Sequence, residues 1–462
     1  MSTTRPLAIA KIGEMDQGGG AAAVASGLMR GYRSLGHQVW QFVGRKRGDD
    51  PSVIPLADDE RPAARATGYA AAQRLLRRCA ARHPDRGFGL ASRSLRLVTH
   101  PSALIGKLRG LEDFDFPGTH HLLERLDRSP DVVHAHNLHG GFFDLRALAS
   151  LTAQVPTILT LHDMWVMTGH CAHALGCDRW QRGCGACPDL TLDPAIHRDA
   201  TAANWQRKQQ VFSASRLHIA TPSRWLREQV DRSMLAPLVQ DVRVIANGVD
   251  TAVFRPGDRA AARVSLGLPL DRQIVLLTAG SRGSMWKDDR TLHGTMRRLV
   301  TTRGADALLF VAVGRESAAR ISGAPVRSDA FVHDAACMAR YYQAADLYLH
   351  AARADTFPLA ILEAMACGTP VIATEVGGIA EQIVPASVAA VRARAIGHAT
   401  GVLVDAGAEA DMATAADALL ADAETGAQMG ANGVRRVRAC FSLGRQVEAY
   451  LSWYRELLAA AS

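Results

Sequence analysis

Short apolar runs alternate with helical patterns along most of this 462-residue chain, and the alternation occurs in two series. Each run is three to six residues of mainly Val, Ile, Leu and Ala, as is typical of strands buried on both faces. Helical crossovers between such strands predict parallel sheets, so we expect an α/β fold with two doubly wound domains facing across a cleft. The strands of the first series are expected at 7–12, 39–43, 132–135, 157–161, 217–221 and 242–245, and those of the second at 274–278, 308–313, 347–349, 371–373 and 402–404.

The two series predict two Rossmann-like domains of similar size. We expect the first over residues 1–240 and the second over 241–443. A closing helix over 444–462, which overlaps an amphipathic pattern at 440–458, is expected to pack back onto the first domain. Residues 45–125, rich in Arg and Ala, interrupt the alternation and are interpreted as helices and loops inserted into the first domain. Ligands of open parallel sheets bind beyond the carboxyl ends of the strands, so the facing edges are the expected site.

Charge and hydropathy exclude several classes of protein. The formal net charge is +8, which suits an anionic small molecule, a membrane surface or nucleic acid. The sequence has no run of about 18 apolar residues, so no transmembrane helix is predicted. The first residues lack the apolar core of a secretory signal. We therefore expect a cytoplasmic protein.

The strongest motif lies in residues 355–374, which read from Asp355 through Phe357, Pro358 and Leu359 to Glu363 and then Ala-Met-Ala-Cys-Gly-Thr-Pro-Val-Ile-Ala-Thr. Pro358 suits the first helical position, and the free N–H groups of a first helical turn attract phosphate or a sugar oxygen. Two carboxylates eight residues apart beside such a helix suit the hydroxyls of a sugar nucleotide. From the spacing alone, a helix cap at Asp355 and an exposed charge at Glu363 explain the segment equally well.

This segment resembles the donor-binding motif of retaining glycosyltransferases of family 4, which have the GT-B fold and include bacterial exopolysaccharide and colanic-acid enzymes. The Phe-Pro-Leu turn, Glu363 and the residues after it match the family pattern, whereas Asp355 and Thr356 stand where the family usually has Glu and Gly. The resemblance extends over most of the chain. It implies that Glu363 binds the ribose and that Asp355 and the turn at Phe357 bind the sugar.

Two further loops agree with the resemblance. Arg282 and Lys287, five residues apart after the strand at 274–278, resemble the family's Gly-Arg…Lys loop, and two such cations can clamp a diphosphate. Read alone, they are more often solvated loop cations. Gly19 and Gly20, at the start of the first helix, correspond to a Gly-Gly loop that lets the backbone approach the donor.

The same glycines allow a nicotinamide-dependent enzyme as a rival interpretation. Gly18, Gly20 and Ala23 fit a dinucleotide-binding pattern, and basic residues at 45–47 suit a 2′-phosphate. However, the residues from Gly13 to Gln17 separate these glycines from the expected strand, which disfavours the rival.

Histidines gather at two strand ends of the first domain. His162 follows the strand at 157–161 and resembles the family's active-site histidine, although a histidine at a strand end also occurs without function. His134, His136 and His139 suggest a metal site only weakly, because no carboxylate joins them at ligand spacing. We expect His136 and Asn137 to line the cleft.

Half of the eight cysteines fall in one short segment after His162. One C-x-x-C pair and two more thiols suit a structural zinc ion, while a disulfide and free thiols remain open. The cysteines are Cys171, Cys177, Cys184 and Cys187.

The resemblance implies transfer of a sugar from a nucleotide diphosphate sugar to a hydroxyl of a glycan or lipid-linked acceptor, in polysaccharide or glycolipid assembly. The catalytic residues would be His162, Arg282, Lys287 and Asp355, with no cofactor and no divalent cation at the diphosphate. Two alternatives remain on the same fold: a sugar-nucleotide epimerase or phosphorylase, and a non-catalytic nucleotide-sugar binder. We expect no nucleic-acid partner.

A basic segment predicts where the acceptor lies. Arg74, Arg78 and Arg82 are four residues apart and share one face of a predicted amphipathic helix, beside Leu75 and Cys79. Such helices rest on anionic lipid, so we expect peripheral binding to the inner face of a membrane. A solvated helix packed onto the first domain explains the pattern equally well.

Overall fold

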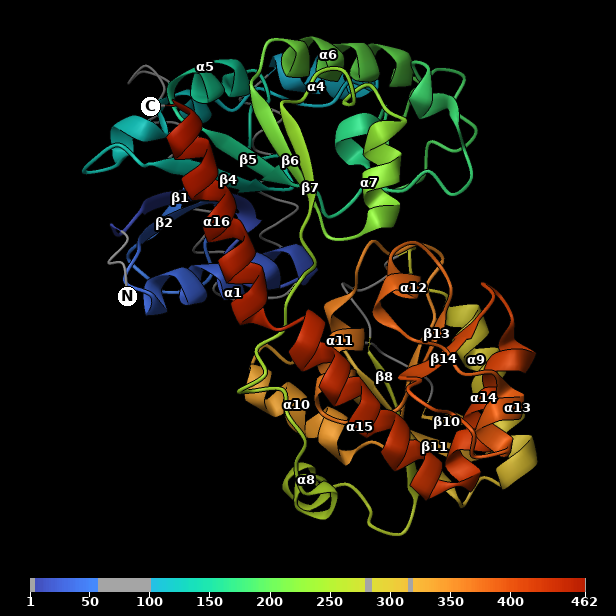
Figure 1. Ribbon diagram of the computed structural model, residues 1–462. Helices are drawn as coiled ribbons and strands as arrows, with labels where there is room; N and C mark the ends of the chain where they lie inside the picture. The colour runs from blue at the N-terminus through green and yellow to red at the C-terminus, as the bar shows by residue number, and fades with distance from the viewer. Residues whose placement is uncertain (1–4, 57–100, 279–284, 315–318, 462) are drawn as a thin grey trace, which may run out of the picture.

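The computed structural model describes residues 5–56, 101–278, 285–314 and 319–461. Two seven-stranded sheets lie in two domains, one above the other in Figure 1. Among the described strands, every pairing is parallel except that of β10 with β11. The two doubly wound domains predicted from the sequence are therefore confirmed.

The first sheet has the order β3-β2-β1-β4-β5-β6-β7. Consecutive residues of its strands belong to different apolar clusters: Ile9 of β1 packs on the face covered by α1, and Ala10 on the opposite face. Its strands are β1 (Ala8–Met15), β2 (Gln38–Arg45), β3 (Val53–Pro55), β4 (Val132–His136), β5 (Thr157–Thr160), β6 (Leu217–Thr221) and β7 (Asp241–Val244). Its helices are α1 (Gly20–Ser34), α4 (Pro101–Leu108), α5 (Ala147–Gln154), α6 (Thr201–Ser213) and α7 (Arg224–Asp231).

The second sheet has the order β10-β11-β9-β8-β12-β13-β14. Its strands are β8 (Gln273–Thr278), β9 (Leu308–Val313), β10 (Arg320–Ile321), β11 (Ala324–Asp329), β12 (Leu347–His350), β13 (Val371–Thr374) and β14 (Gly401–Val404). The helices around it are α8 (Arg259–Leu266), α9 (Asp289–Arg303), α10 (Ala335–Ala344), α11 (Leu359–Ala366), α12 (Ile379–Gln382), α13 (Val388–Arg392), α14 (Glu409–Ala421) and α15 (Ala423–Cys440).

The domain boundary predicted after residue 240 is wrong. Residues Asp241–Val244 form β7, which pairs with β6 at the edge of the first sheet. The sequence Asp-Val-Arg-Val alternates charged and apolar side chains, as an edge strand does, and the chain leaves the first domain only after it. Strands β3, β10 and β11, also at or near the sheet edges, were not predicted.

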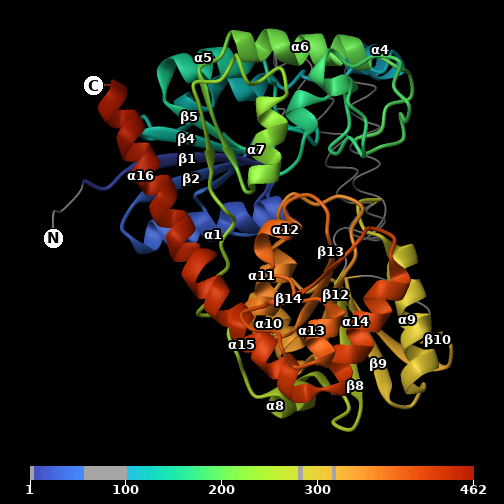
Figure 2. The ribbon, with the colours of Figure 1, turned by 45° about the vertical axis from the view of Figure 1, so that its right-hand side comes forward.

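The last helix, α16 (Leu443–Ala461), lies on the first domain beside α1, as Figure 1 and Figure 2 show. Trp453, Tyr450 and Tyr454 of α16 are fully buried among residues of β1, β2, β4 and α1. The helix predicted over 444–462 corresponds to α16, whereas the amphipathic pattern of 440–458 begins at Cys440, the last residue of α15. The chain therefore crosses between the domains twice, once after β7 and once between α15 and α16.

The two crossings are bonded to each other. Val249 N donates to the Phe441 carbonyl at 2.9 Å, and Leu443 N donates to the Val249 carbonyl at 2.9 Å. A Cβ at Gly248 would lie 2.7 Å from the Ser442 carbonyl oxygen, so the close approach requires glycine. The two crossing segments thus form one connection between the domains.

No described helix is both long and apolar enough to cross a bilayer.

Candidate functional site

Three polar side chains meet at the carboxyl ends of β8 and β12 in the second domain. Lys287 Nζ lies 2.9 Å from Asp355 Oδ2 and 3.1 Å from His350 Nε2. His350 is the last residue of β12, and its Nδ1 is 3.0 Å from the Tyr348 hydroxyl. Lys287 and Asp355, both predicted site residues, are therefore brought together.

The backbone holds this cluster in place. Lys287 forms an isolated antiparallel bridge with Ala352, and Arg353 N donates to the Trp286 carbonyl at 2.7 Å. On the other side, Gly377 has φ of 55°, and a Cβ there would lie 1.9 Å from the Asp355 carbonyl oxygen. The loop after β13 thus reaches Asp355 only because residue 377 is glycine.

The charges of the cluster follow from its surroundings. Burial would raise the pKa of Asp355, but the Lys287 ammonium overcomes this and holds that pKa well below its usual range. Burial, with Lys287 acting in the same direction, lowers the pKa of His350 to about 4. At neutral pH the cluster consists of a carboxylate, an ammonium and a neutral imidazole.

Glu363 lies in α11, whose first residue is Leu359. Pro358, expected at the first helical position, immediately precedes the helix, and no side chain caps its first turn. The Tyr342 hydroxyl donates to Glu363 Oε2 at 3.0 Å. Burial raises the pKa of Glu363 to about 7, because the neutral phenol offsets desolvation only in part.

The first domain contributes paired histidines at the ends of β4 and β5. His136 Nδ1 lies 3.0 Å from His162 Nε2, and the Asn137 side-chain oxygen accepts from His162 N at 2.9 Å. Burial lowers the pKa of His162 to about 4 and the pKa of His136 well below its usual value. Both rings are neutral at pH 7, and one proton lies between them.

A charged pair supports these histidines. Asp163 Oδ2 accepts from Asn137 Nδ2 at 2.6 Å and lies 2.7 Å from His139 Nε2. Burial would lower the pKa of His139, but the Asp163 carboxylate overcomes this and raises it. Asn137 has φ of 32°, an uncommon conformation that lets one amide bond both Asp163 and the His162 backbone.

The glycine loop opens α1 as predicted. Gly19 precedes the first residue of α1, Gly20, and has φ of 78°. A Cβ at Gly19 or Gly20 would meet no atom within 4 Å, so ligand atoms can approach this backbone. Asp16 fixes the neighbouring loop, because its two carboxylate oxygens each accept at 2.7 Å from the backbone N–H groups of Arg47 and Gly48.

The two halves of the site touch. The Thr356 hydroxyl donates to the His162 carbonyl at 2.7 Å, and Asn247 Nδ2 donates to the Phe357 carbonyl at 3.2 Å. Thr356, noted in the sequence as a departure from the family pattern, is therefore the residue that joins the donor-motif segment to the predicted histidine.

A carboxylate of the second domain also caps a helix of the first. Glu381 of α12 accepts from the backbone N–H groups of Arg224 and Trp225 at 2.9 and 2.8 Å. Those groups begin α7, where a helix carries partial positive charge. The contact holds the two domains together beside the site.

The four predicted cysteines and His170 line one small cavity in the loop after His162. The four cysteines are free thiols. Burial raises the pKa of Cys171 to about 12 and that of Cys184 to about 11. Within the described ranges, no three His, Cys, Asp or Glu side chains are arranged so that they could hold a metal ion. The thiols as placed therefore do not fit a zinc ion, and zinc stays a prediction.

Some predicted residues lie outside the described ranges, namely Arg282 and the basic residues Arg74, Arg78 and Arg82. Conversely, sequence reasoning missed His350, Tyr342 and Thr356 as parts of the site. His350 carried a usable signal, because it follows an apolar strand run directly, as His162 does.

Comparisons with known proteins agree with this architecture. Residues 18–253 match the family model described as Glycosyltransferase Family 4, and residues 273–422 match Glycosyl transferases group 1. A D-inositol 3-phosphate glycosyltransferase of Segniliparus rotundus is 31% identical over 229 residues, which are 47% of this chain and 48% of the relative. WcaC of Escherichia coli K12, provisionally named a colanic acid biosynthesis glycosyl transferase, is 27% identical over 256 residues, 53% of this chain and 60% of the relative. The chain thus spans about half the length of the curated relatives it matches.

Solved structures share the fold over nearly the whole chain. Sucrose-phosphate synthase from Thermosynechococcus elongatus has a TM-score of 0.61 at 19% identity, covering 99% of this chain and 100% of that one. Anabaena HepE in complex with UDP and glucose has a TM-score of 0.60 at 16% identity, covering 96% and 99%. The fold is GT-B, and because one family model covers more than half of its length, the chain belongs to glycosyltransferase family 4.

Proposed function

We propose that this protein is a retaining glycosyltransferase that moves a sugar from a nucleotide diphosphate sugar to a hydroxyl acceptor. The observation that carries the proposal is the Lys287–Asp355–His350 cluster, joined through Thr356 to the backbone of His162. A cation for a leaving diphosphate and a carboxylate for sugar hydroxyls thus lie where the two domains meet.

The second domain holds the donor in this proposal. Lys287 binds the diphosphate, with Arg282 assigned the same role from the sequence. Glu363 accepts hydrogen bonds from the ribose hydroxyls, and Asp355 binds the sugar. The fold relationship to HepE, a protein solved with UDP and glucose, supports a nucleotide donor and makes UDP the first nucleotide to test.

The reaction needs positioning and charge stabilisation more than a protein nucleophile. The bond from the sugar C1 to the diphosphate oxygen breaks, and its electron pair leaves with the diphosphate. The acceptor hydroxyl oxygen forms the new bond on the same face, and its proton goes to the departing diphosphate oxygen. Lys287 stabilises the negative charge on that leaving group, which is why no divalent cation is invoked there.

His162 serves as a positioning residue for the sugar or the acceptor. Its Nε2 is engaged by His136, and its Nδ1 makes no hydrogen bond to any described residue. A neutral ring with one nitrogen fixed presents the other to a ligand hydroxyl.

The direct test incubates the protein with UDP-, GDP- and dTDP-sugars and a set of hydroxyl acceptors. Transfer with retained anomeric configuration, or slow donor hydrolysis, is the expected result. An isomerised donor would replace the proposal with an epimerase, and binding without turnover would replace it with a nucleotide-sugar binder.

Lys287→Ala tests the role of the cation. Removing the ammonium should lower kcat/KM, and the decrease should correspond to a loss of about 2–4 kcal/mol of transition-state stabilisation. Circular dichroism and Tm should show an intact fold. Lys107→Ala, which removes an equal charge from an exposed position in α4, should leave kcat/KM within twofold. Near-wild-type activity in folded Lys287→Ala would exclude the diphosphate role.

Polysaccharide or glycolipid assembly at the inner face of a membrane is part of the proposal. The relative named for colanic acid biosynthesis supports it, as does the basic pattern of Arg74, Arg78 and Arg82. We expect binding to anionic vesicles at low salt that is lost when these three residues are changed to Glu. Equal recovery in the supernatant with anionic and neutral vesicles would remove the membrane from the proposal.

A further inference from the structure

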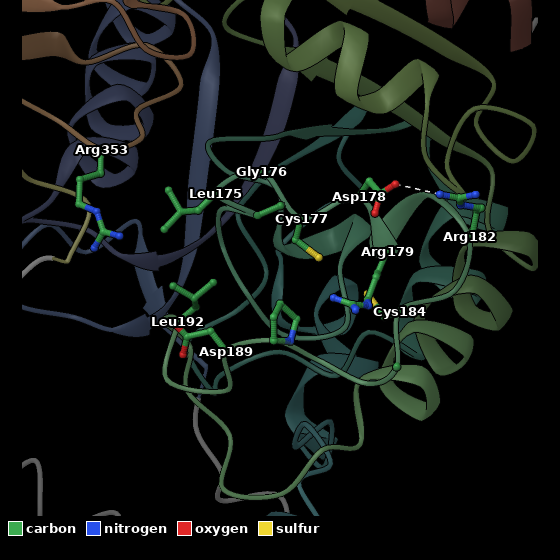
Figure 3. A pocket seen from close by; sticks show the side chains of 13 residues that line it. Leu175, Gly176, Cys177, Asp178, Arg179, Arg182, Cys184, Asp189, Leu192 and Arg353 are labelled. Atoms are coloured by element: carbon green, nitrogen blue, oxygen red, sulfur yellow. Dashed lines mark hydrogen bonds and ion pairs between the residues drawn. The ribbon is translucent and has the colours of Figure 1, made fainter. Parts of the chain in front are cut away.

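A second cavity lies between the cysteine loop of the first domain and the end of β12. Its volume is about 760 Å³, and its wall is formed by residues of the loop between Ala174 and Leu192 on one side and by Arg353 on the other. Figure 3 shows Arg353 on the second-domain side, Arg179 on the loop side, and Leu175 and Leu192 in the same wall.

The cavity adjoins the site described above. Arg353 is two residues before Asp355, and its N–H is bonded to the Trp286 carbonyl beside Lys287. Trp286 in turn packs edge-on against His173 of the cysteine loop, with ring centroids 4.8 Å apart. A molecule in this cavity therefore lies next to the sugar end of the proposed donor site.

The loop that carries Arg179 is firmly anchored. Its neighbour Trp180 is buried and donates from Nε1 to the Cys177 carbonyl at 2.8 Å, and Trp205 of α6 donates to the Trp180 carbonyl at 2.8 Å. The Arg179 carbonyl accepts from Cys184 N at 2.9 Å. The backbone at Arg179 is thus held in place before any ligand arrives.

The charges in the cavity do not cancel. Arg182 is paired with Asp178 at 2.8 Å, but Arg179 and Arg353 form no ion pair with any described residue. Among the described residues of the wall, Asp189 is the only other acidic side chain, and it accepts from the backbone and hydroxyl of Thr191 at 2.9 and 2.6 Å. Two guanidinium groups from different domains, Arg179 and Arg353, therefore line the same cavity as the Asp189 carboxylate. Leu175 and Leu192 add an apolar part to its wall.

We propose that this cavity holds the acceptor and that Arg179 and Arg353 bind an anionic group on it, a phosphate or a carboxylate. Planar guanidinium groups bind both kinds of group through paired N–H···O bonds. The leucine wall suits the apolar face of a sugar ring. This inference rests on the proposed function, because it assigns the acceptor of that same reaction.

The test measures binding of small acceptor probes by calorimetry while the donor site is filled. Of UDP, GDP and dTDP, the one that binds is added to saturation, so that it occupies the diphosphate site at Lys287. The probes are glucose 6-phosphate, glucuronic acid and glucose. Binding of one or both anionic probes at least tenfold tighter than glucose is expected, and the preferred probe identifies the anionic group.

Three variants locate the anion. Arg353→Gln and Arg179→Gln should each weaken binding of the anionic probe about tenfold. The affinity of each variant protein for the nucleotide should stay unchanged. Arg198→Gln, an equal loss of charge from an exposed residue outside the cavity wall, should leave binding within twofold. No preference for the anionic probes, or equal binding in all three variants, would overturn the inference.

Failure of this inference is distinguishable from failure of the proposed function. Nucleotide binding without anion selectivity would remove the acceptor site and leave the donor site standing. If no nucleotide binds, the proposed function fails, and binding of the anionic probe that depends on Arg353 would then show an anion site unrelated to glycosyl transfer.

Discussion

The two carboxylates of the donor motif lie eight residues apart and have opposite pKa shifts. Asp355 lies beside an ammonium, so its pKa is held low, whereas Glu363 has a neutral phenol as its partner and its pKa is raised to about 7. The first is charged throughout the physiological range. The second changes charge within that range, so donor binding should depend on pH through Glu363.

We predict that the donor KM rises as pH falls below 7. If only ionised Glu363 accepts the ribose hydroxyls, one pH unit below its pKa weakens binding about tenfold. The KM measured from pH 5.5 to 8 should show this rise in the wild-type protein. In Glu363→Gln, the KM should be high and nearly flat over the same range.

The same group affects stability with a defined sign. Between its usual pKa of 4.5 and about 7, folded Glu363 binds more protons than the unfolded chain, so its contribution falls as pH rises through this window. Urea denaturation at pH 5 and pH 7.5 should show a smaller loss with rising pH in Glu363→Gln than in the wild type. An identical difference in both proteins would mean that Glu363 is not titrating there.

Where spacing carries information, the sequence named residues that the structure brings together. Asp355 and Lys287 were identified from a motif and a loop pattern, and they form an ion pair. His350 and Tyr342 were missed because their role depends on which strand and helix lie next to the motif. That adjacency is a property of the sheet order, and no local pattern encodes it.

At the scale of elements, glycines set how closely helices pack in the second domain. A Cβ at Gly430 of α15 would lie 1.9 Å from the Gly368 carbonyl oxygen, just after α11. The atom it meets is backbone, which cannot rotate away as a side chain can. Helix α15 therefore approaches α11 at a distance that only glycine allows.

Gly430→Ala should lower the free energy of unfolding by about 1–3 kcal/mol, since overpacking costs more than the gain in helix propensity. Gly444→Ala in α16 is the matched control, because a Cβ there meets nothing within 4 Å. That change should be neutral or stabilise by up to about 1 kcal/mol. Equal urea midpoints for the two variants would contradict the packing argument.

Strands buried in the middle of a sheet could be predicted from the sequence, whereas the shortest strands at its edges could not. Strands in the middle of each sheet contain buried apolar runs, and β9 has the predicted bounds of Leu308–Val313. The edge elements β3 and β10 are three and two residues long, too short to show a period. The amphipathic pattern over 440–458 runs across the break between α15 and α16, because amphipathic character continues on both sides of it.

At the scale of the whole molecule, Glu381 of the second domain caps helix α7 of the first domain and so links the two domains. A carboxylate at a helix N-terminus contributes about 0.5–2 kcal/mol. In Glu381→Ala the domains should separate more often, so small-angle X-ray scattering of the ligand-free protein should give a larger radius of gyration. Glu375→Ala removes an exposed carboxylate after β13 and should leave the scattering unchanged. Superimposable curves for all three proteins would show that Glu381 does not restrain the domains.

The placement of α16 also has a consequence for synthesis on the ribosome. Tyr450, Trp453 and Tyr454 complete the apolar cluster that α1 forms with β1 and β4, and they are translated about 200 residues after β7. Because translation proceeds at about 5–20 residues per second, the last helix of the first domain is synthesised roughly 10–40 s after β7. The second domain, whose strands and helices end at Cys440, has all of its own elements before then. The domain synthesised first is therefore the one completed last, and we expect its apolar surface around α1 to stay exposed during that interval.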